Sequence, residues 1–513
     1  MDNRNCLVSF WQEKIKRTWK TAFFAVLFFG LIAHTYKFTN TLYNHDALFN
    51  GHTTQNTIEL GRWFLSVACG IGGFFDLPWM NGLLSLFWIG ITAAVIAEIF
   101  AVYDPIVLIL EGGLLVTFPC ITNTFFYEYT ADGYMIAMLF AALAVYFSRM
   151  GDNKVLHFIL AIVFLCFSCG IYQAYVSFAL MLSICYFLRE ILTSDHTARE
   201  IWLWIRNQVV LYGGGMLAYL GAWKLCMLAQ QAAASEYQGI DNIGKIDPGA
   251  LMPALKENIR LLLQFFLGGN IFSHGLTGYA ALNIVFLVSF VFLLVFFAVK
   301  ARLAKKPLEL ILFFACLLVI PVVPCFWLYL SPGVGYHMLM LQSLCVLYLF
   351  ALFLASQLSS AIIKGFLTVL FGVLVFRFSL QANASYYKME QCMEHSRTTA
   401  IEMLTRIHLL DEGSARRIAF LGGGDQSLIA SGDTDIRELQ VNAHQLRSTL
   451  VFDNLYAPIF LYKISGYYYQ PVEESELAAL ETRLMDEMDT WPGKNSLRIE
   501  GDTVIIRLPD PVS

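Results

Sequence analysis

Apolar residues fill the first 380 positions in a series of long segments, and short polar stretches separate each segment from the next. A helix needs roughly 20 mostly apolar residues to cross a bilayer, and by this rule the pattern predicts about eleven membrane-spanning helices. The runs within 155–188 are interrupted only at Cys169-Gly170, so they also fit one span with an interfacial tail. The expected ranges are 18–36, 81–102, 105–123, 132–148, 155–170, 171–188, 207–227, 281–301, 309–330, 337–357 and 363–380.

The Lys and Arg residues of the short loops indicate an orientation in the membrane. With a cytoplasmic N-terminus, the loops on the inner side are basic, whereas the outer connection 329–336 has no Lys or Arg. The inner basic residues are Arg149, Lys154, Arg189, Arg199, Arg206, Lys300, Arg302, Lys305 and Lys306. Four basic residues precede the first apolar run, Lys14, Lys16, Arg17 and Lys20, and no small-residue cleavage pattern follows it, which is typical of a retained signal anchor. Eleven spans then put the residues after about 380 outside, in the periplasm of a bacterium.

The pattern changes sharply after residue 380, where charged residues become frequent and long apolar runs end. Residues 386–410 have helical periodicity, residues 417–421 have the pattern of a strand, and residues 497–508 have that of a hairpin. We therefore expect two domains, a polytopic α-helical membrane domain over 1–380 and a small α/β domain over 381–513.

Two other polar segments fall on the outer side, at residues 37–80 and 228–280. In the first of them, residues 59–65 have the pattern of an interfacial amphipathic helix. A loop of this length between two spans is the expected place for residues that act on a substrate at the membrane surface.

Composition supports a membrane protein and excludes several other classes. Hydrophobic residues make up 57% of the chain and charged residues 14%, and the mean hydropathy is +0.59. The formal net charge of −5 argues against a nucleic-acid-binding surface. The 11 cysteines lie mostly in or beside apolar runs and show no secreted disulfide pattern. No cluster of His or Asp with metal-ligand spacing is present, so we expect no cofactor, and a divalent metal is without support.

Ionisable residues at membrane depth or at helix ends are functional candidates, because their burial is costly. Several such residues from distant parts of the sequence share the outer face, and this convergence predicts a site there. They are Asp46, Glu59, Arg62, Asp76, Glu128, Asp132, His274, His337 and Arg377.

Asp46 follows the first predicted span in the polar stretch Tyr43-Asn44-His45-Asp46. A carboxylate near apolar walls can accept a proton from a sugar hydroxyl, so Asp46 is our candidate for a catalytic base. The alternative is that Asp46 caps a helix that begins at Ala47.

Glu128 and Asp132 are four residues apart and share a face if that stretch is helical. With tyrosines beside them, above all Tyr129, they suit a sugar whose ring stacks and whose hydroxyls bond to carboxylates. The alternative is an aromatic belt at the interface, with Asp132 as a helix cap.

Arg62, His337 and Arg377 are candidates to bind a phosphate group, since arginine makes bidentate contacts with phosphate. The alternative for each of them is a cation at the membrane interface whose side chain only extends to reach water. Glu59 lies one turn before Arg62 and joins the candidate substrate-binding set. The pair Tyr172-Gln173 is predicted either to touch the substrate or to hydrogen-bond between helices.

Several of these stretches together resemble a known family. Tyr43 to Asp46, Gly61-Arg62-Trp63, Asp76 to Leu84, Tyr127 to Asp132 and Gly170 to Ala174 occur in the order found in the glucosyl transferase type II family. These Gtr proteins modify the O-antigen of lipopolysaccharide in serotype conversion. The resemblance covers roughly residues 20–380.

The resemblance implies a multi-pass glycosyltransferase of the GT-C type in the bacterial inner membrane. Its donor would be undecaprenyl-phosphate glucose and its acceptor a lipid-linked O-antigen repeat, with transfer in the periplasm. A donor-synthesising glycosyltransferase and a flippase are implied as partners. In this type of enzyme an acid on the first outer loop is the usual base, the position of Asp46. Family members often have two adjacent acids there, whereas this chain has His45-Asp46, which weakens a metal-binding carboxylate pair.

The mechanism that follows is a direct displacement in which Asp46 takes the acceptor proton and Arg62 stabilises the leaving phosphate. Three other interpretations stay open: a GT-C enzyme that decorates another polymer, a flippase for lipid-linked sugars, and a structural membrane subunit. A flippase would be expected to carry charges through the middle of its bundle, and here Glu111 and Lys224 are the main charges at that depth.

Overall fold

The computed structural model describes residues 15–151, 154–236, 239, 248–267, 278–331, 334–411, 413, 415–423 and 449–509. His274, a candidate from the sequence, lies outside these residues. In the described part, the chain forms two compact units. Unit 1 runs to Thr39 and from His52 to Asn383, and unit 2 combines Asn40–Gly51 with the residues from Ala384 onward. The sequence predicted a boundary at 380 and assigned all of 37–80 to the membrane domain.

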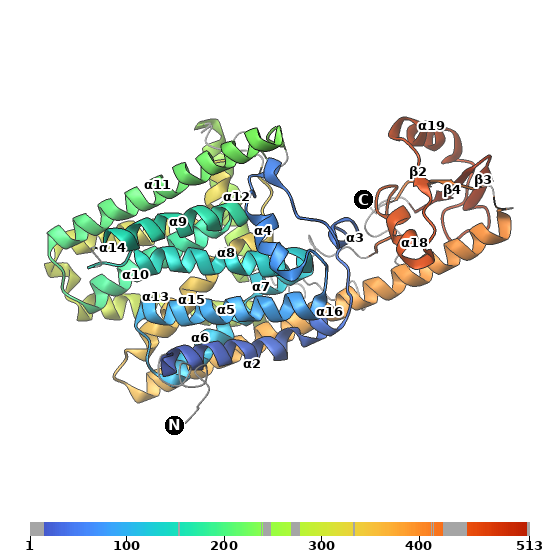
Figure 1. Ribbon diagram of the computed structural model, residues 1–513. Helices are drawn as coiled ribbons and strands as arrows, with labels where there is room; N and C mark the ends of the chain where they lie inside the picture. The colour runs from blue at the N-terminus through green and yellow to red at the C-terminus, as the bar shows by residue number, and fades with distance from the viewer. Residues whose placement is uncertain are drawn as a thin grey trace, which may run out of the picture. The chain divides into compact units, whose positions relative to one another are not determined.

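Unit 1 is helical (Figure 1). Its principal helices are α2 (Arg17–Thr39), α4 (Leu65–Cys69), α5 (Pro78–Phe100), α6 (Pro105–Thr117), α7 (Pro119–Thr124), α8 (Glu128–Phe147), α9 (Val155–Ile171), α10 (Tyr175–Thr193), α11 (Ala198–Gln230), α12 (Leu251–Leu267), α13 (Gly278–Lys300), α14 (Pro307–Val319), α15 (Leu344–Ser356) and the first part of α16 (Ala361–Leu410). Short 3₁₀ helices lie between them: η1 (Ile58–Leu60), η2 (Gly70–Gly72), η3 (Phe125–Tyr127), η5 (Pro248–Ala250), η6 (Leu303–Lys305), η7 (Val323–Tyr329) and η8 (Met338–Leu341).

Eight helices of the described chain are long and apolar enough to cross a membrane, or up to nine if a bent pair counts as one span. That pair is α14 with η7, which meet at 66°. Helix α9 has 17 residues and falls short of the length required for a span. The helices from α6 to α8 follow one another with short breaks over 43 residues and count as one candidate span. The protein is thus a polytopic helical membrane protein, but the expected count of about eleven spans is not confirmed.

Local sequence explains where these helices begin. Helices α5, α6, α7 and α14 have proline at their first position, where the missing N–H costs no hydrogen bond. Asp104 caps α6 by accepting a hydrogen bond from the N–H of Ile106 at 2.9 Å. Thr197 and Glu200 form a capping box at the start of α11.

Small residues allow the central helices to pack closely. Helix α5 packs on α2 and α8, α8 packs on α9, and α9 packs on α11. A β-carbon at Gly82 of α5 would lie 2.4 Å from the ring of Phe38 on α2. At Gly112 of α6 it would lie 3.0 Å from the carbonyl oxygen of Ala22 on α2. Helices α2, α5, α6 and α8 therefore form a close-packed centre from which the polar end of α8 is presented.

The predicted amphipathic helix over 59–65 is wrong. The helix η1 ends at Leu60, Gly61 takes a left-handed conformation with φ 75°, and the next helix, α4, begins only at Leu65. A left-handed residue reverses the chain direction and ends a helical turn. The segment from His52 to Leu77 is consequently a folded loop made of short helical turns.

Unit 2 contains a four-stranded sheet in the order β2-β1-β4-β3. The strands are β1 (Arg417–Leu421), β2 (Gln470–Pro471), β3 (Leu497–Glu500) and β4 (Thr503–Arg507). Strand β1 pairs parallel to β2 and β4, and β3 pairs antiparallel to β4. The predicted strand at 417–421 and the predicted hairpin are confirmed.

Helices cover both faces of this sheet. Ile418 and Phe420 of β1 pack with the end of α16 and with α18 (Ala457–Ser465). Ala419 and Leu421 point to the other face and pack with α19 (Glu474–Leu484). The alternation follows the two-residue period of a strand with both faces buried.

Candidate functional site

Lys37 and Glu128 form a buried ion pair between the C-terminal end of α2 and the N-terminal end of α8. Lys37 Nζ lies 2.5 Å from Glu128 Oε2, and the two side chains are 2% and 1% exposed. Burial of two charges is costly and is tolerated only where they are paired at close range. Asp76, in the loop before α5, interacts electrostatically with Glu128 and adds a second negative charge to this region.

Asp132 lies one turn further along α8, so Glu128 and Asp132 do share a helical segment. Asp132 Oδ1 accepts a hydrogen bond from the N–H of Gly133 at 2.8 Å. Residue Tyr127, and not Asp132, is the N-cap of α8, so the alternative in which Asp132 caps this helix is wrong.

Three buried oxygens in this region have no hydrogen-bond donor among the described residues: Asp132 Oδ2, Glu128 Oε1 and Asn81 Oδ1. Gly72 lies against two of them, because a β-carbon there would be 2.8 Å from Asp132 Oδ2 and 3.0 Å from Asn81 Oδ1. Asn81 also donates from Nδ2 to the carbonyl oxygen of Glu128 at 3.3 Å. We name Asn81, Glu128 and Asp132 the acceptor group. Buried polar atoms are normally paired, so an unpaired set of acceptors is a reason to expect a function.

Arg62 is held beside two stacked tyrosines. Its Nη1 donates to the hydroxyl of Tyr134 at 3.3 Å, and its guanidinium lies 4.8 Å from the centre of the Tyr172 ring. The two rings stack at 4.5 Å with an interplanar angle of 7°. This arrangement combines a cation suited to phosphate with an aromatic surface.

The loop that carries Arg62 is anchored by its backbone. Gln173 Nε2 donates to the carbonyl oxygen of Leu60 at 2.8 Å and to the Tyr219 hydroxyl at 3.0 Å. Trp223 Nε1 donates to the carbonyl oxygen of Ile58 at 2.7 Å. The N–H of Phe64 donates to the carbonyl oxygen of Gly170 at 2.8 Å. Gln173 is therefore occupied by protein groups, which favours the hydrogen-bonding alternative over contact with substrate.

Cys69 of α4 packs against α8 beside Asp132. A β-carbon at Gly133 would lie 2.8 Å from its sulfur. Burial raises the pKa of the Cys69 thiol well above its usual range, and the nearby Asp132 carboxylate raises it further. The thiol stays protonated near neutral pH and acts as a small packed side chain.

Asp46 is part of unit 2 and is one-third exposed. Its Oδ1 accepts a hydrogen bond from the Tyr456 hydroxyl at 3.4 Å and lies 3.5 Å from His45 Nε2. The helix that follows, α3 (Ala47–Asn50), has no side-chain cap from Asp46, so the capping alternative is not supported. The carboxylate is thus accessible and has two polar neighbours able to orient it.

The remaining predicted residues are half-buried on separate elements. Tyr129 is in the first turn of α8, with its ring 6.4 Å from that of Tyr127. The carbonyl oxygen of Glu59 in η1 accepts a hydrogen bond from the N–H of Ser235 at 3.0 Å. His337 precedes η8, and Arg377 is on α16. Their predicted contacts with substrate stay predictions.

Sequence reasoning missed Lys37, Asn81 and Tyr134. Asn81 and Tyr134 fall within the predicted spans 81–102 and 132–148, and Lys37 is the first residue of the predicted loop 37–80. A signal was present for Lys37, because it is a charged residue that directly follows the apolar run 18–36. Among the described residues, no group of three or more His, Cys, Asp or Glu could hold a metal ion.

Comparison with known proteins gives one positive result. A family model described as glucosyl transferase GtrII matches residues 35–355, well over half of the chain. The match includes the acceptor group, Arg62 and Asp46. No curated protein and no solved structure matches the chain.

Proposed function

We propose, on the premise that this chain belongs to the glucosyl transferase GtrII family, that it moves glucose from undecaprenyl-phosphate glucose to a lipid-linked O-antigen. Membership of the family supports a glycosyltransferase in a membrane environment. The lipid donor, the O-antigen acceptor and a role in serotype conversion are the parts that we propose.

The reaction is a single displacement at the anomeric carbon of the glucosyl group. The acceptor hydroxyl oxygen forms a bond to this carbon, the bond from the carbon to the phosphate oxygen breaks, and its electron pair leaves with undecaprenyl phosphate. The hydroxyl proton passes to a carboxylate acting as general base. We assign that role to Asp46, which is accessible and lies beside Tyr456 and His45.

The observation that carries the proposal beyond the family is the position of Arg62 over the Tyr134–Tyr172 stack. A departing phosphate develops negative charge that a guanidinium neutralises with two hydrogen bonds. The aromatic surface suits the apolar face of a sugar or an isoprenoid unit. His337 and Arg377 are proposed to assist at the phosphate.

The acceptor group supports recognition of a sugar. Its unpaired oxygens on Asp132, Glu128 and Asn81 need hydrogen-bond donors, and sugar hydroxyls are donors. We propose that Asp132 and Glu128 bind hydroxyls of the substrate, with Tyr129 and Glu59 at its edge.

We further propose that the protein lies in a bacterial inner membrane with its N-terminus cytoplasmic and with about eleven spans. The basic residues of the loops at one end of unit 1 support this orientation. Unit 2, including Asp46, would then be periplasmic, where lipid-linked O-antigen is modified.

The test measures glucose transfer in membranes supplied with undecaprenyl-phosphate glucose and lipid-linked O-antigen. Asp46→Asn keeps the shape of the side chain and removes the base, so transfer should fall by about 10²–10⁴-fold while donor binding remains. Asp486→Asn is the matched control, because this aspartate is exposed in the same unit, and it should transfer at the wild-type rate.

The other outcomes are distinct. Transfer that survives in Asp46→Asn would assign the base to Glu128 or Asp132. If the wild-type protein transfers no glucose but moves lipid-linked sugar across the bilayer, the protein is a transporter.

A further inference from the structure

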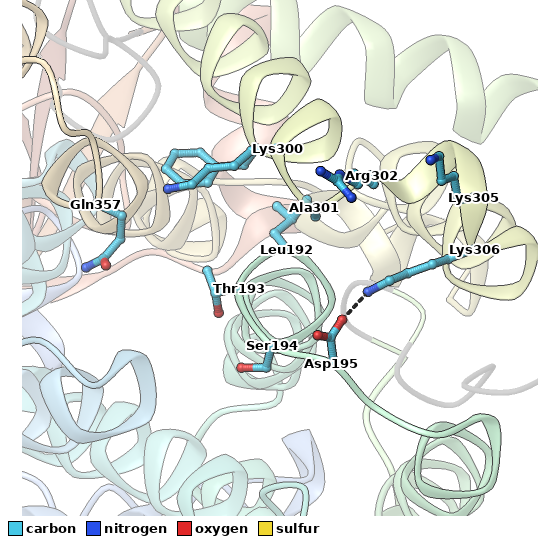
Figure 2. Close-up of a pocket in the computed structure, with 11 residues that line it drawn as sticks. Leu192, Thr193, Ser194, Asp195, Lys300, Ala301, Arg302, Lys305, Lys306 and Gln357 are labelled. Atoms are coloured by element: carbon cyan, nitrogen blue, oxygen red, sulfur yellow. Dashed lines mark hydrogen bonds and ion pairs between the residues drawn. The ribbon is translucent and has the colours of Figure 1, made fainter.

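A cavity of about 590 Å³ lies at the end of unit 1 where α10, α13 and α15 end. It is shown in Figure 2, where Lys300 lies on one side of the view, Lys305 and Lys306 lie on the other, and Lys306 reaches toward Asp195. Its lining residues are Leu192, Thr193, Ser194, Asp195, Phe297, Lys300, Ala301, Arg302, Lys305, Lys306 and Gln357.

The charge of this cavity is strongly positive. Four cations line it against one carboxylate, Asp195, which is paired with Lys306 at 2.5 Å. Glu309 lies 3.5 Å from the same lysine. Among the described residues no carboxylate lies within ion-pair distance of Lys300, Arg302 or Lys305, so three cations of the lining have no acidic partner there.

Arg302 supplies one of these charges from an unusual backbone position. Its φ of 55° is in the left-handed region, where glycine is the favoured residue. An arginine at such a position is retained at a cost in strain, which is common where a side chain is needed at a binding site.

The helices α13 and α14, which lie next to the cavity, expose apolar side chains. Val295 and Val299 of α13 are 57% and 72% exposed, and Ile311 and Leu318 of α14 are 66% and 78% exposed. In a membrane protein such faces contact lipid chains. A molecule with an anionic head and apolar chains would therefore match both the cavity and the adjoining helices.

Basic loop residues also set the orientation of a membrane protein, and these four serve that purpose. Orientation, however, depends only on the number of positive charges near the span ends. It does not require them to line one cavity together with the side chains of Ser194 and Gln357.

We propose that this cavity binds the phosphate group of an anionic membrane lipid, with Lys300, Arg302 and Lys305 as its ligands. Basic pockets between the ends of membrane helices bind lipid phosphates by this chemistry. The lipid would hold the ends of α10, α13 and α15 together at the opposite end of unit 1 from the acceptor group. This inference does not depend on the transfer reaction.

The test is native mass spectrometry of the full-length protein in detergent, titrated with palmitoyl-oleoyl phosphatidylglycerol or with the matching phosphatidylcholine. The wild-type protein should prefer the anionic lipid. The double variant Lys300→Gln/Lys305→Gln should bind it at least about tenfold more weakly, because each cation near a lipid phosphate contributes to affinity. The control is Arg199→Gln/Arg206→Gln, which removes two exposed charges from α11 and should bind like the wild type.

The remaining arms identify the source of the phosphate. Competition by glycerol 3-phosphate or inorganic phosphate in the wild type, and its loss in Lys300→Gln/Lys305→Gln, would support recognition of the head group. Binding of the soluble phosphates without binding of phosphatidylglycerol would overturn the lipid proposal. Equal weakening by both double variants, or no preference for the anionic lipid, would also overturn it.

Discussion

The buried charged residues of unit 1 differ in how many of their polar atoms have an ion-pair or hydrogen-bond partner within the protein. Lys37 and one oxygen of Glu128 are paired with each other, whereas the second oxygen of Glu128 and one oxygen of Asp132 have no donor among the described residues. We therefore expect the ion pair to stabilise the folded protein and the unpaired oxygens to bind substrate.

Lys37→Met should destabilise unit 1 by about 3–5 kcal/mol, because it leaves the Glu128 charge buried without its cation. Lys37→Met/Glu128→Gln removes both charges and should recover most of that loss. Thermal unfolding in detergent measures both effects. An unchanged unfolding temperature for the single variant would contradict a stabilising pair.

Asp132→Asn should leave stability nearly unchanged, since Oδ1 can still accept the Gly133 N–H. The Michaelis constant for the lipid donor should rise about 10–100-fold, because hydrogen bonds to charged groups contribute about 1.5–3 kcal/mol. Steady-state kinetics together with an unfolding curve separate the two effects. A donor Michaelis constant equal to that of the wild type would remove Asp132 from the substrate-binding residues.

At this scale the sequence could identify residue types but not their partners. Asp46, Arg62, Glu128 and Asp132 were all selected because charge at a helix end is costly. Their neighbours were not predictable, since Lys37 pairs with Glu128 across 91 positions and Tyr456 meets Asp46 across 410. Such pairing depends on tertiary packing, which a local pattern does not contain.

Among the elements, the loop from His52 to Leu77 determines where Arg62 lies. Its left-handed Gly61 leaves no room for a side chain, because a β-carbon would lie 2.4 Å from the Tyr219 hydroxyl and 2.5 Å from Gln173 Nε2. Both the left-handed conformation and the lack of space therefore require glycine at position 61.

Gly61→Ala should lower stability and raise the Michaelis constant for the donor, because the loop must shift away from Tyr219 and Gln173. Gly73→Ala is the matched control: Gly73 is also left-handed, with φ 78°, but has open space around it. The control should show only the backbone strain of about 1–2 kcal/mol. Equal kinetics for the two variants would mean that the Gly61 contacts do not position Arg62.

Most elements were predictable because apolar runs are a local property. The break between α9 and α10 falls at Tyr172, three residues after the expected Cys169, and the strand at 417–421 is exact. The helix expected over 59–65 is not formed because the left-handed Gly61 ends the first turn, which the apolar spacing alone does not indicate. The span count differed because α6 to α8 form one nearly continuous stretch, α9 has only 17 residues, and α14 is bent against η7.

Across the whole molecule, the segment with Asp46 and the C-terminal residues form one folded unit. Leu48, two residues after Asp46, belongs to the same apolar core as Phe420, Phe460 and Val504. The placement of Asp46 should therefore depend on the integrity of the sheet and its helices.

Phe460→Ala removes a fully buried ring from this core and should cost unit 2 about 3–5 kcal/mol. Transfer should fall with it, because the support of the Asp46 segment is weakened. Limited proteolysis should show faster cleavage after Ala384 while unit 1 keeps its resistance. Exposed Leu455→Ala is the control and should change neither result. Full transfer by an unfolded unit 2 would exclude Asp46 as the base.

The composition of unit 2 also affects the order of events during synthesis. Asn40–Gly51 leaves the ribosome more than three hundred residues before the strands and helices with which it packs. At about 5–20 residues per second, roughly 20–90 s pass before the rest of that unit exists. During this interval the nascent chain has its first helices but lacks Tyr456 and the core beneath Leu48. A partly made or truncated chain would thus remain inactive, since Asp46 acquires its surroundings only when the last quarter of the chain has folded.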